Sequence, residues 1–285
     1  FNHALSPAQE RNIVRELQRR VMDRTGLILE IFAQRAQTSE GKLQVELAQL
    51  QHLSTRLVRG WTHLERQRGG LGKTGGPGEK QIELDRRYIA QRVRILKGKL
   101  ESLKKQRGTQ RRARARRDVL SVSIVGYTNA GKSTLFNALT AAKAYEADQL
   151  FATLDTTTRR IWLPRTGDVV LSDTVGFIRD LPHGLVAPSA AMQEETVHAD
   201  LLLHEVDAAP RSREQQAPDV DKVLAETPPG DAPQLLVWNK IDAAGLEPAV
   251  ERDQYGRICR VFVSARTGAG LDGVRAAIAR VVRVR

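Results

Sequence analysis

The sequence GYTNAGKS, residues 126–133, constrains the fold of this chain more than any other stretch. It follows an apolar run at 120–125 and precedes a helix-like run at 134–142. The pattern G-x-x-x-x-G-K-[ST] between a strand and a helix is typical of a loop that binds phosphate through backbone N–H groups and a helix N-terminus. The sequence therefore predicts an α/β domain that begins with this strand, loop and helix.

Further apolar runs predict the rest of that domain. Strand-like runs alternate with helical stretches at 120–125, 161–163, 169–171, 201–206, 235–238 and 261–263. Strands that alternate with helices form a mainly parallel sheet that helices cover on both faces. We therefore expect a parallel, doubly wound α/β domain over residues 118–285.

The phosphate-binding loop supplies the first candidate site residues. We expect Lys132 to reach the β- and γ-phosphates of a nucleotide and Ser133 to bind Mg²⁺. The backbone N–H groups around them are expected to surround the phosphates. The candidate loop residues are Gly126, Tyr127, Thr128, Asn129, Ala130, Gly131, Lys132 and Ser133.

A second motif, DTVG, follows the predicted strand at 169–171. Asp173 is expected to hold Mg²⁺ through water, and the Gly176 N–H to meet a γ-phosphate. Thr174 and Val175 lie between them and are candidate site residues as well. The catalytic candidates from these two motifs are therefore Lys132 and Gly176.

Two more motifs indicate which base is bound. In NKID, which follows the strand at 235–238, the Asp242 carboxylate would accept the N1–H and N2–H₂ donors that guanine offers and adenine lacks. We expect Asn239 to bond the guanine O6 and the loop backbone, and the Lys240 stem to cover the ring. The motif SAR after the last strand is expected to contact O6 through its backbone. The candidates are Asn239, Lys240, Ile241, Asp242, Ser264, Ala265 and Arg266. The sequence thus predicts a GTP-binding domain.

Two heptad patterns precede this domain. Apolar positions spaced alternately by four and three residues are Leu43, Leu47, Leu50, Ser54, Leu57, Trp61 and Leu64, and then Ile89, Val93, Leu96, Leu100 and Leu103. A helix buries such a seam against another helix. We expect an antiparallel helical hairpin over 41–117, with an irregularity at Gly98 because glycine weakens helices. The alternative is two seams that pack flat on a globular core.

The net charge of +12 is concentrated in the second arm of that hairpin. Between Arg86 and Arg117 there are fourteen basic residues and one acid, Glu101. Such a segment is typical of a surface that binds a polyanion, with nucleic acid first and an anionic membrane second. No apolar run approaches the ~20 residues that cross a bilayer, so we expect no membrane insertion.

The segment QRGGLGKTGGPGEKQ, residues 67–81, joins the two arms. Its Gly72-Lys73-Thr74 resembles the end of a phosphate-binding loop, but Gln67 stands where the first glycine is required. The segment also lies between two helices and not between a strand and a helix. We therefore exclude it as the nucleotide site.

The start of the chain resembles the end of a small α/β unit over 1–40. Ser6 and Pro7 are typical of a helix start. A short strand is expected at 21–22, followed by a helix that Thr25 caps. The one cysteine, Cys259, lies in a strand-like run and is expected to be a small buried side chain. A lone cysteine excludes an intrachain disulfide and agrees with a reducing cytosol.

The motifs together resemble the HflX GTPases. The matching stretches are GYTNAGKSTLFN, FATLDTTTR, DTVGFIRDLP and ADLLLH, with GGLGKTGGPGEKQIELDRRYIAQR upstream. The resemblance implies GTP hydrolysis with Mg²⁺, binding of the large ribosomal subunit and its RNA through the hairpin, and splitting or rescue of ribosomes. Because the glycine-rich tip, 69–78, has no bulky side chains, we expect it to enter a narrow RNA-lined space, where its backbone amides, Lys73 and Lys80 meet phosphates. The alternative for the tip is a disordered connector.

The resemblance also assigns the first switch. The residues alone leave the choice open among Thr153, Thr156, Thr157 and Thr158. The family pattern FATLD makes Thr153 the threonine that closes over Mg²⁺ and the γ-phosphate, and so a third catalytic candidate. The metal candidates are then Ser133, Thr153 and Asp173, and the switch adds Phe151, Ala152, Thr153, Leu154 and Asp155.

The chain departs from the family pattern at several positions. Phe177 stands where many GTPases have a glutamine that orients the attacking water, so we expect slow hydrolysis without the ribosome. Thr156 replaces an expected proline, Pro188 and Ser189 interrupt an expected helix, and Glu205 replaces an apolar strand residue. A buried carboxylate without a partner would be protonated or destabilising. His183 is either a water-orienting group or a surface histidine.

Two other classes of function compete with a ribosome-activated GTPase. One is an RNA- or ribosome-binding adaptor whose GTP state only controls docking. The other is a membrane-surface protein that uses the basic arm. We expect a cytoplasmic monomer, with peripheral membrane association as the alternative location.

Overall fold

The computed structural model describes residues 1–60, 77–115, 119–141, 151, 153–164, 166–178, 196–209 and 232–281. The chain divides into two units, and the first comprises Phe1–Thr109. The second begins at Gln110 and contains the sheet. In the described part of the chain, no helix is long and apolar enough to cross a membrane.

The first helix, α1 (Pro7–Leu17), begins where the sequence predicts. Ser6 lies at the N-cap in extended backbone, and its hydroxyl accepts a hydrogen bond from the Gln9 N–H at 3.3 Å. The Gln9 side chain accepts one in return from the Ser6 N–H at 2.9 Å. This reciprocal pair satisfies two backbone donors that a helix start leaves unpaired.

The second helix, α2 (Arg24–Arg35), begins two residues earlier than a Thr25 cap allows. Asp23 is the N-cap, and its Oδ1 accepts a hydrogen bond from the Gly26 N–H at 2.8 Å. A carboxylate caps better than threonine here because it also interacts favourably with the positive end of the helix dipole. Thr25 lies within the first turn, so its predicted role was wrong.

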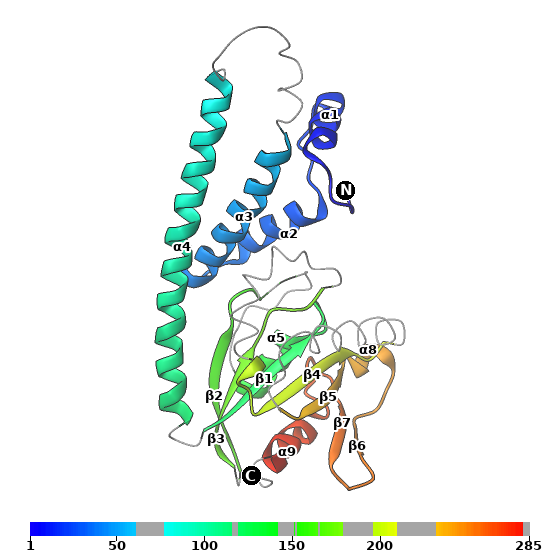
Figure 1. Cartoon of the computed structure of the whole chain (residues 1–285). Coiled ribbons are helices and arrows are strands. Elements are labelled where there is room, and N and C mark those ends of the chain that lie inside the picture. The colour runs from blue at the N-terminus through cyan, green and yellow to red at the C-terminus, as the bar shows by residue number, and fades with distance from the viewer. Residues whose placement is uncertain are drawn as a thin grey trace. The chain divides into compact units, whose positions relative to one another are not determined.

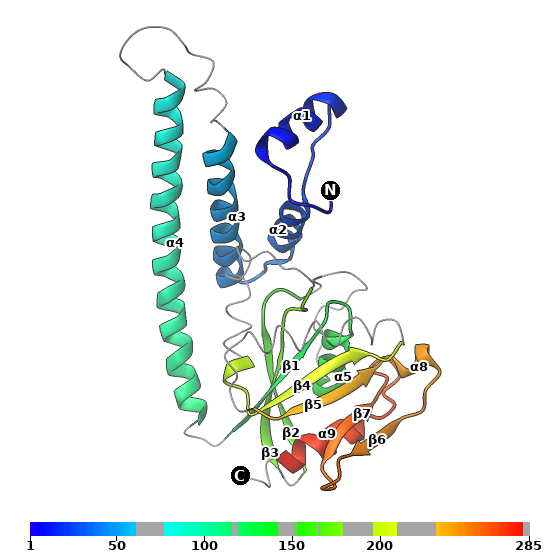
Figure 2. The ribbon, with the colours of Figure 1, turned by 45° about the vertical axis from the view of Figure 1, so that its right-hand side comes forward.

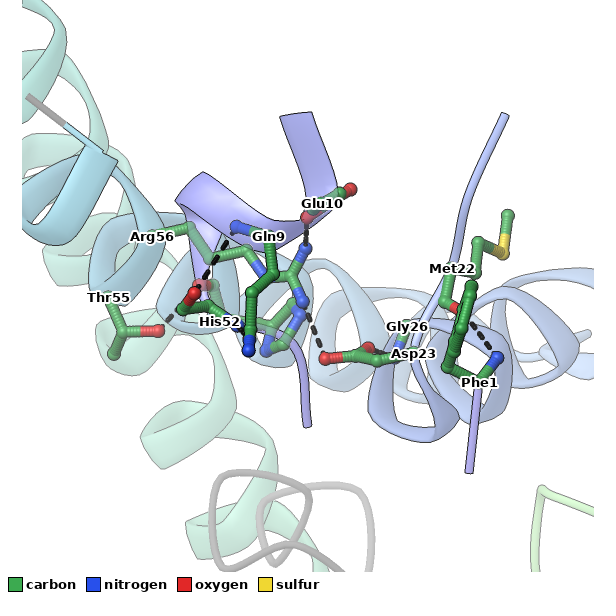
Figure 3. A network of polar contacts seen from close by, with 10 residues as sticks. Phe1, Gln9, Glu10, Met22, Asp23, Gly26, His52, Thr55 and Arg56 are labelled. Carbon is green, nitrogen blue, oxygen red and sulfur yellow. Dashed lines mark hydrogen bonds and ion pairs between the residues drawn. The ribbon is translucent and has the colours of Figure 1, made fainter. Parts of the chain in front are cut away.

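The strand predicted at 21–22 is absent from the described residues of this unit. Met22 O accepts a single hydrogen bond, from the Phe1 amino group at 2.9 Å. Figure 3 shows this contact beside the start of α2. A single bond does not make a ladder, and a strand is stabilised only by pairing along its length.

Arg56 joins three helices of this unit. It lies on α3 (Ser39–Gly60) and forms ion pairs with Glu10 of α1 and with Asp23, whose Oδ2 is 2.5 Å from Nη2. Figure 3 shows the Arg56 guanidinium between these two carboxylates. Asp23 is buried and therefore needs this partner, because a buried unpaired charge is costly. The pair holds the capped end of α2 against α3.

The predicted hairpin is formed by α3 and α4 (Pro77–Ala115), which run antiparallel side by side in both views (Figures 1 and 2). Ion pairs join them at Arg92–Glu46, 2.6 Å, and Arg107–Glu40, 2.8 Å. The residues directly before and after each seam position of α4 are exposed, whereas the seam positions themselves are partly or fully buried. These seam positions are Ile89, Val93, Leu96, Leu100 and Leu103. The heptad prediction for α4 is therefore confirmed.

Parts of the hairpin prediction fall outside the described residues. Trp61, Leu64 and residues 69–76 of the tip are among them, as is the side chain of Leu57. Pro77, which was predicted to belong to the tip, begins α4 instead. Proline is favoured there because the first helical N–H has no intrahelical partner in any case.

The irregularity expected at Gly98 does not occur, because α4 runs unbroken from Pro77 to Ala115. A Cβ built on Gly98 would have no atom within 4 Å. The cost of glycine at one exposed position is about 1 kcal/mol, which a long helix with a buried seam tolerates.

We therefore expect Gly98→Ala to raise the free energy of unfolding by roughly 0.5–1 kcal/mol, since alanine restricts the unfolded chain and meets open space. Urea unfolding followed by circular dichroism measures it. Gly245 also faces open space but has φ +66°, so Gly245→Ala should destabilise instead. A loss of stability in Gly98→Ala would contradict a helical backbone at this position.

The second unit is built on a seven-stranded sheet in the order β2-β3-β1-β4-β5-β7-β6. The strands are β1 (Leu120–Gly126), β2 (Thr157–Leu163), β3 (Gly167–Asp173), β4 (Leu201–Asp207), β5 (Gln234–Asn239), β6 (Ala249–Arg252) and β7 (Ile258–Phe262). The five central strands are parallel, as predicted. The two edge strands are antiparallel to their neighbours, which the prediction of a parallel sheet did not include.

The edge strand β6 was missed because all four of its residues are exposed and carry no apolar alternation. At the other edge, only residues 164–166 separate β2 from β3, and β3 begins at Gly167, where φ is +84°. A hairpin of this length forces the two strands to be antiparallel. Sheet order and direction thus follow from connections and not from the strand sequences.

Helices α5 (Lys132–Thr140) and α9 (Leu271–Val281) share one apolar core with the strands. Leu135, Phe136 and Leu139 of α5 enter this core, which places the start of α5 firmly at the end of β1. The core therefore fixes the phosphate-binding loop at both of its ends.

Cys259 is exposed, which corrects the prediction of a buried side chain. It lies on β7 one residue before Arg260, where pairing with β5 begins. Val261, two residues further on the same face, is buried in the core. Cys259 thus lies just beyond the covered part of its strand.

Candidate nucleotide-binding site

The candidate residues lie at the carboxyl ends of the parallel strands, where open α/β sheets bind ligands. The loop after β1 leads directly into α5, so its N–H groups lie at the N-terminus of a nine-residue helix. Gly131 is the N-cap with φ +115°, and a Cβ there would lie 2.2 Å from Asn239 Nδ2. Only glycine fits this position, both for its backbone angle and for its space.

Lys132 folds back over this loop. Its Nζ donates a hydrogen bond to Tyr127 O at 2.7 Å, and the residue is only 6% exposed. Burial lowers the pKa of Lys132, while the nearby carboxylates of Glu205 and Asp173 act in the opposite direction. A Cβ on Gly176 would lie 2.9 Å from Nζ, so the two catalytic candidates Lys132 and Gly176 lie close together.

Ser133, Thr153 and Asp173 meet at one point. Ser133 Oγ lies 2.7 Å from Asp173 Oδ2 and 2.6 Å from Thr153 Oγ1, which is 3.1 Å from the same carboxylate oxygen. The structure therefore brings Thr153 to this point, whereas Thr157 and Thr158 belong to β2.

The same cluster suits a hard cation. Asp173 is fully buried, and burial raises its pKa against the opposing hydrogen bond from Ser133. Asp173 Oδ1 has no hydrogen-bond partner among the described residues. Two hydroxyls and one carboxylate with an unused oxygen fit Mg²⁺, which prefers oxygen ligands. A site built from three or more His, Cys, Asp or Glu side chains is absent from the described part of the chain.

A pocket of about 920 Å³ lies beside the loop. Its lining includes the predicted residues Asn129, Gly131, Asn239, Lys240, Asp242, Ala265 and Arg266. It also includes residues that the sequence interpretation missed: Thr134, Asn137, Ala138, Ala243, Thr267, Gly268 and Leu271. The size suits one small-molecule ligand.

The missed lining residues follow two simple patterns. Thr134, Asn137 and Ala138 are spaced by three and four residues on α5, so they share one helix face with Gly131. Thr267 and Gly268 continue the loop after SAR. Helical periodicity counted from Gly131 was the signal that would have found the first group.

Asn239 braces the site from β5. It is 2% exposed, and its Nδ2 donates to Ala130 O at 3.3 Å and to Glu205 Oε1 at 2.5 Å. Its Oδ1 accepts from the N–H groups of Lys240, 2.8 Å, and Ala265, 2.9 Å. One amide therefore ties the phosphate-binding loop to the SAR loop, which bears out the expected loop contact. Its contact with a base stays a prediction.

Lys240 makes a second brace. Its Nζ donates to Asn129 O at 2.7 Å and lies 3.1 Å from Asp207 Oδ2. Asp207 ends β4 and was not predicted as a site residue. The described contacts of Lys240 are thus to the protein, and its packing on a base ring stays a prediction.

Several candidates lie in the site region with their side chains packed away. Thr174 Oγ1 donates to Ile124 O at 2.6 Å. The buried side chains are those of Phe151, Leu154, Thr174, Val175, Ile241 and Ser264. Their contact with a ligand stays a prediction. Ala152, His183, Pro188 and Ser189 lie outside the described residues.

Phe177 is buried and forms part of the loop support. Its N–H donates to Gly126 O at 3.0 Å, and its carbonyl accepts from the Thr128 N–H at 2.7 Å. The position that carries a water-orienting glutamine in many GTPases is therefore used here for packing against the phosphate-binding loop.

Three family models match successive parts of the chain. Residues 1–33 match a model described as GTP-binding GTPase N-terminal, and residues 35–114 match one described as GTP-binding GTPase Middle Region. Residues 121–240 match a model described as 50S ribosome-binding GTPase. The matches follow the order of the elements and extend over both units.

Individual relatives agree with these models. The GTPase HflX of Escherichia coli (strain K12) is 58% identical over 272 residues, which are 95% of this chain and 64% of that protein. The GTPase HflX of Spirochaeta thermophila is 43% identical over 280 residues, which are 98% of this chain and 68% of that protein. The chain belongs to the HflX GTPase family. It spans just under two thirds of the length of the E. coli HflX protein.

Solved structures show the same architecture. A GTP-binding protein from the hyperthermophilic archaeon Sulfolobus solfataricus, in complex with GDP, is 25% identical and aligns with a TM-score of 0.56 over 99% of this chain and 79% of that chain. A complex of SsGBP with GDP is also 25% identical and aligns with a TM-score of 0.58 over 99% of this chain and 80% of that chain. The chain therefore shares its fold with GTP-binding proteins that were solved in complex with GDP.

Proposed function

We propose that this HflX chain binds GTP and GDP with Mg²⁺, hydrolyses GTP, and acts as a monomer on the large ribosomal subunit in the cytoplasm. The observation that carries the proposal is the meeting of Ser133, Thr153 and Asp173 beside Lys132, next to a pocket that Asp242 lines. A nucleotide with Mg²⁺ requires a phosphate-binding loop, oxygen ligands for the metal and a pocket for the base. The candidate residues for all three lie at the carboxyl ends of the parallel strands.

The phosphates are bound by Lys132 and by the N–H groups at the start of α5. Ser133, Thr153 and Asp173 hold Mg²⁺, which neutralises charge on the phosphates when it is bound. Gly176 lies beside Lys132 and has no side chain, so its N–H meets the terminal phosphate without obstruction. Loss of that phosphate removes the partners of Thr153 and Gly176, and this frees the first switch and the DTVG segment.

The base is selected by Asp242. It lies in the first turn of α8 (Ile241–Ala244), is exposed and lines the pocket. Its carboxylate accepts two hydrogen bonds from guanine, and adenine offers neither. The backbone of 264–266 meets O6, and Asn239 holds that segment in place through the Ala265 N–H.

Hydrolysis by the isolated chain is slow. Phe177 offers no polar group and is committed to packing. The attacking water must therefore be oriented by another group, which the ribosome supplies.

Ribosome binding is supported by α4 and by the family model that matches residues 121–240. The exposed basic side chains along α4 include Arg86, Arg94, Lys97 and Lys99. A row of cations on a long helix binds the RNA backbone through its phosphates. From this contact we infer that GTP binding drives the splitting or rescue of ribosomes.

A second candidate function is an adaptor that docks on ribosomal RNA in its GTP state and hydrolyses little. The packed position of Phe177 favours it. Flotation with anionic vesicles, compared with sedimentation with ribosomal subunits, separates both functions from a membrane-surface protein.

The first experiment is GTP turnover by the purified chain, alone and with large ribosomal subunits. We expect strong stimulation by the subunits, and we expect it to disappear in a variant without residues 69–78. Reversing the charges of Arg86, Arg94, Lys97 and Lys99 to Glu should weaken binding to the subunits and reduce its dependence on salt, because fewer counterions are released.

The matched control reverses exposed charges elsewhere in the same unit, at Arg11 and Arg19 of the α1 region, and should leave the stimulation intact. Turnover that is equally fast without subunits would contradict the proposed activation. GTP binding without any stimulation would favour the adaptor.

A further inference from the structure

Glu205 is a fully buried acid directly beside the phosphate-binding loop. It lies on β4 at 0% exposure, in register with Gly126 of β1 on one side and Val237 of β5 on the other. Burial of a carboxylate in the middle of a sheet is costly unless a specific partner compensates. The proposed nucleotide chemistry gives this acid no role.

The contacts of Glu205 place it against the underside of the loop. Oε1 accepts a hydrogen bond from Asn239 Nδ2 at 2.5 Å, and the same Nδ2 donates to Ala130 O. A Cβ built on Gly131 would lie 2.9 Å from Oε1. A single backbone segment therefore separates the carboxylate from the space above the loop.

Oε2 is the unused half of this group. It is buried and has no hydrogen-bond partner among the described residues. A protonated carboxyl group can donate a hydrogen bond or remain neutral there, whereas an ionised one leaves a charge without compensation. The site thus suits a proton on this oxygen.

The charged groups that face Glu205 come from three elements. Lys132 at the start of α5 and Lys240 after β5 are cations, and Asp173 at the end of β3 is a second acid. When no phosphate is present, the two carboxylates are the counter-charges of the buried Lys132. A bound phosphate would take over Lys132 and add negative charge on the other side of the loop.

We propose that Glu205 sets the affinity for nucleotide by taking up one proton from solvent as the phosphates bind. The proton binds to the Glu205 carboxylate, and Lys132 then pairs with the phosphates in place of Glu205. This inference rests on the proposed phosphate site, and it makes Glu205 a positioning residue that acts through Lys132 and Asn239.

The raised pKa of Glu205 agrees with this proposal. Burial raises the pKa of Glu205 from 4.5 to about 7, against the opposing effects of Lys132 and of the Asn239 hydrogen bond. A phosphate nearby would raise the pKa further. Because the bound state then holds more protons than the empty one, nucleotide affinity falls as pH rises above 7.

The free energy of unfolding of the chain without nucleotide depends on pH in the same direction as nucleotide affinity does. The folded chain binds a proton that the unfolded chain has already lost between pH 4.5 and about 7. The free energy of unfolding therefore falls as pH rises through this window. A neutral residue at 205 removes that dependence.

The test is calorimetric binding of GDP at pH 6, 7 and 8 with constant Mg²⁺, for the unaltered chain and for Glu205→Gln. Glutamine keeps an acceptor for Asn239 and cannot titrate. We expect the Kd of the unaltered chain to rise about tenfold more than that of the variant between pH 6 and 8, which corresponds to one linked proton. Titration of GDP itself is the same for both proteins and cancels.

The calorimetric titration at pH 8 is then repeated in two buffers of different ionisation enthalpy. The difference between the two binding enthalpies gives the number of protons taken up per GDP bound. The unaltered chain should take up close to one proton, and Glu205→Gln close to none. Uptake of the same size in Glu205→Gln would show that a group other than Glu205, such as Lys132, takes up the proton, and this would overturn the inference. Equal pH profiles in the two proteins would overturn it as well.

A second variant guards against misfolding. Glu205→Val is apolar and favours strands, and it should give the same flat profile. Thermal unfolding should show that the unaltered chain loses stability relative to both variants as pH rises from 6 to 8. The same pH dependence of stability in all three proteins would contradict the role of Glu205. If neither the unaltered chain nor the variants bind GDP at any pH, the proposed nucleotide site itself fails.

Discussion

Replacing Asp242 by asparagine is expected to weaken GDP binding about 1,000-fold, because two charge-assisted hydrogen bonds of roughly 1.5–3 kcal/mol each are lost or replaced by a repulsive donor pair. The same variant should gain affinity for xanthosine diphosphate. Xanthine carries a carbonyl oxygen where guanine carries the amino group. The side-chain amide that Asp242→Asn introduces donates to that oxygen, while its own oxygen accepts from N1–H.

Asp242 is well placed for such a test. It is exposed in the first turn of α8 and lines the pocket, so its replacement disturbs no buried contact. Calorimetric titration with both diphosphates gives the two affinities. Asp272→Asn is the control, because this substitution makes the same change in charge on α9, at a side chain that is 99% exposed. Unchanged GDP affinity in Asp242→Asn would show that the base binds elsewhere.

Replacing Asn239 by alanine should lower the free energy of unfolding by about 3 kcal/mol, since each buried polar group left without a partner costs roughly 1–3 kcal/mol. The lost bonds are those with Ala130 O, Glu205 Oε1 and the N–H groups of Lys240 and Ala265. GDP binding should fall more than about 100-fold, because a small displacement of a binding loop is that costly.

Urea unfolding and GDP titration measure the two effects of Asn239→Ala. Gln234→Ala is the matched control, because Gln234 is an exposed amide at the start of the same strand. We expect the control to change stability by less than about 0.5 kcal/mol. A similarly small effect at Asn239 would mean that the loop contacts contribute little to the fold or to the site.

Local sequence patterns predict most of the helices, strands and loops around the site. The strand–loop–helix at 120–140 follows from an apolar run, glycines at fixed positions and a helical period. The seam of α4 follows from the alternation of four and three residues, and its positions are partly or fully buried as that pattern requires. Short-range periodicity and backbone sterics do not depend on distant residues, and the sequence therefore predicts these features well.

Long-range contacts were harder to predict. Thr25 and Asp23 are both good helix caps, and the choice between them depends on Arg56, which lies 33 residues beyond Asp23. Gly98 weakens an isolated helix, but a buried seam along α4 outweighs this single loss. Residues far apart in the sequence decide both cases.

The sequence by itself determined the phosphate-binding loop, the guanine motif at Asp242 and the alternation of strands and helices, because each is a local pattern with one dominant physical reading. Only the tertiary structure decided that Asn239 braces two loops and that Glu205 lies beneath the loop. These contacts join strands and loops far apart in the chain, and their energies depend on burial and on charged neighbours that folding brings together.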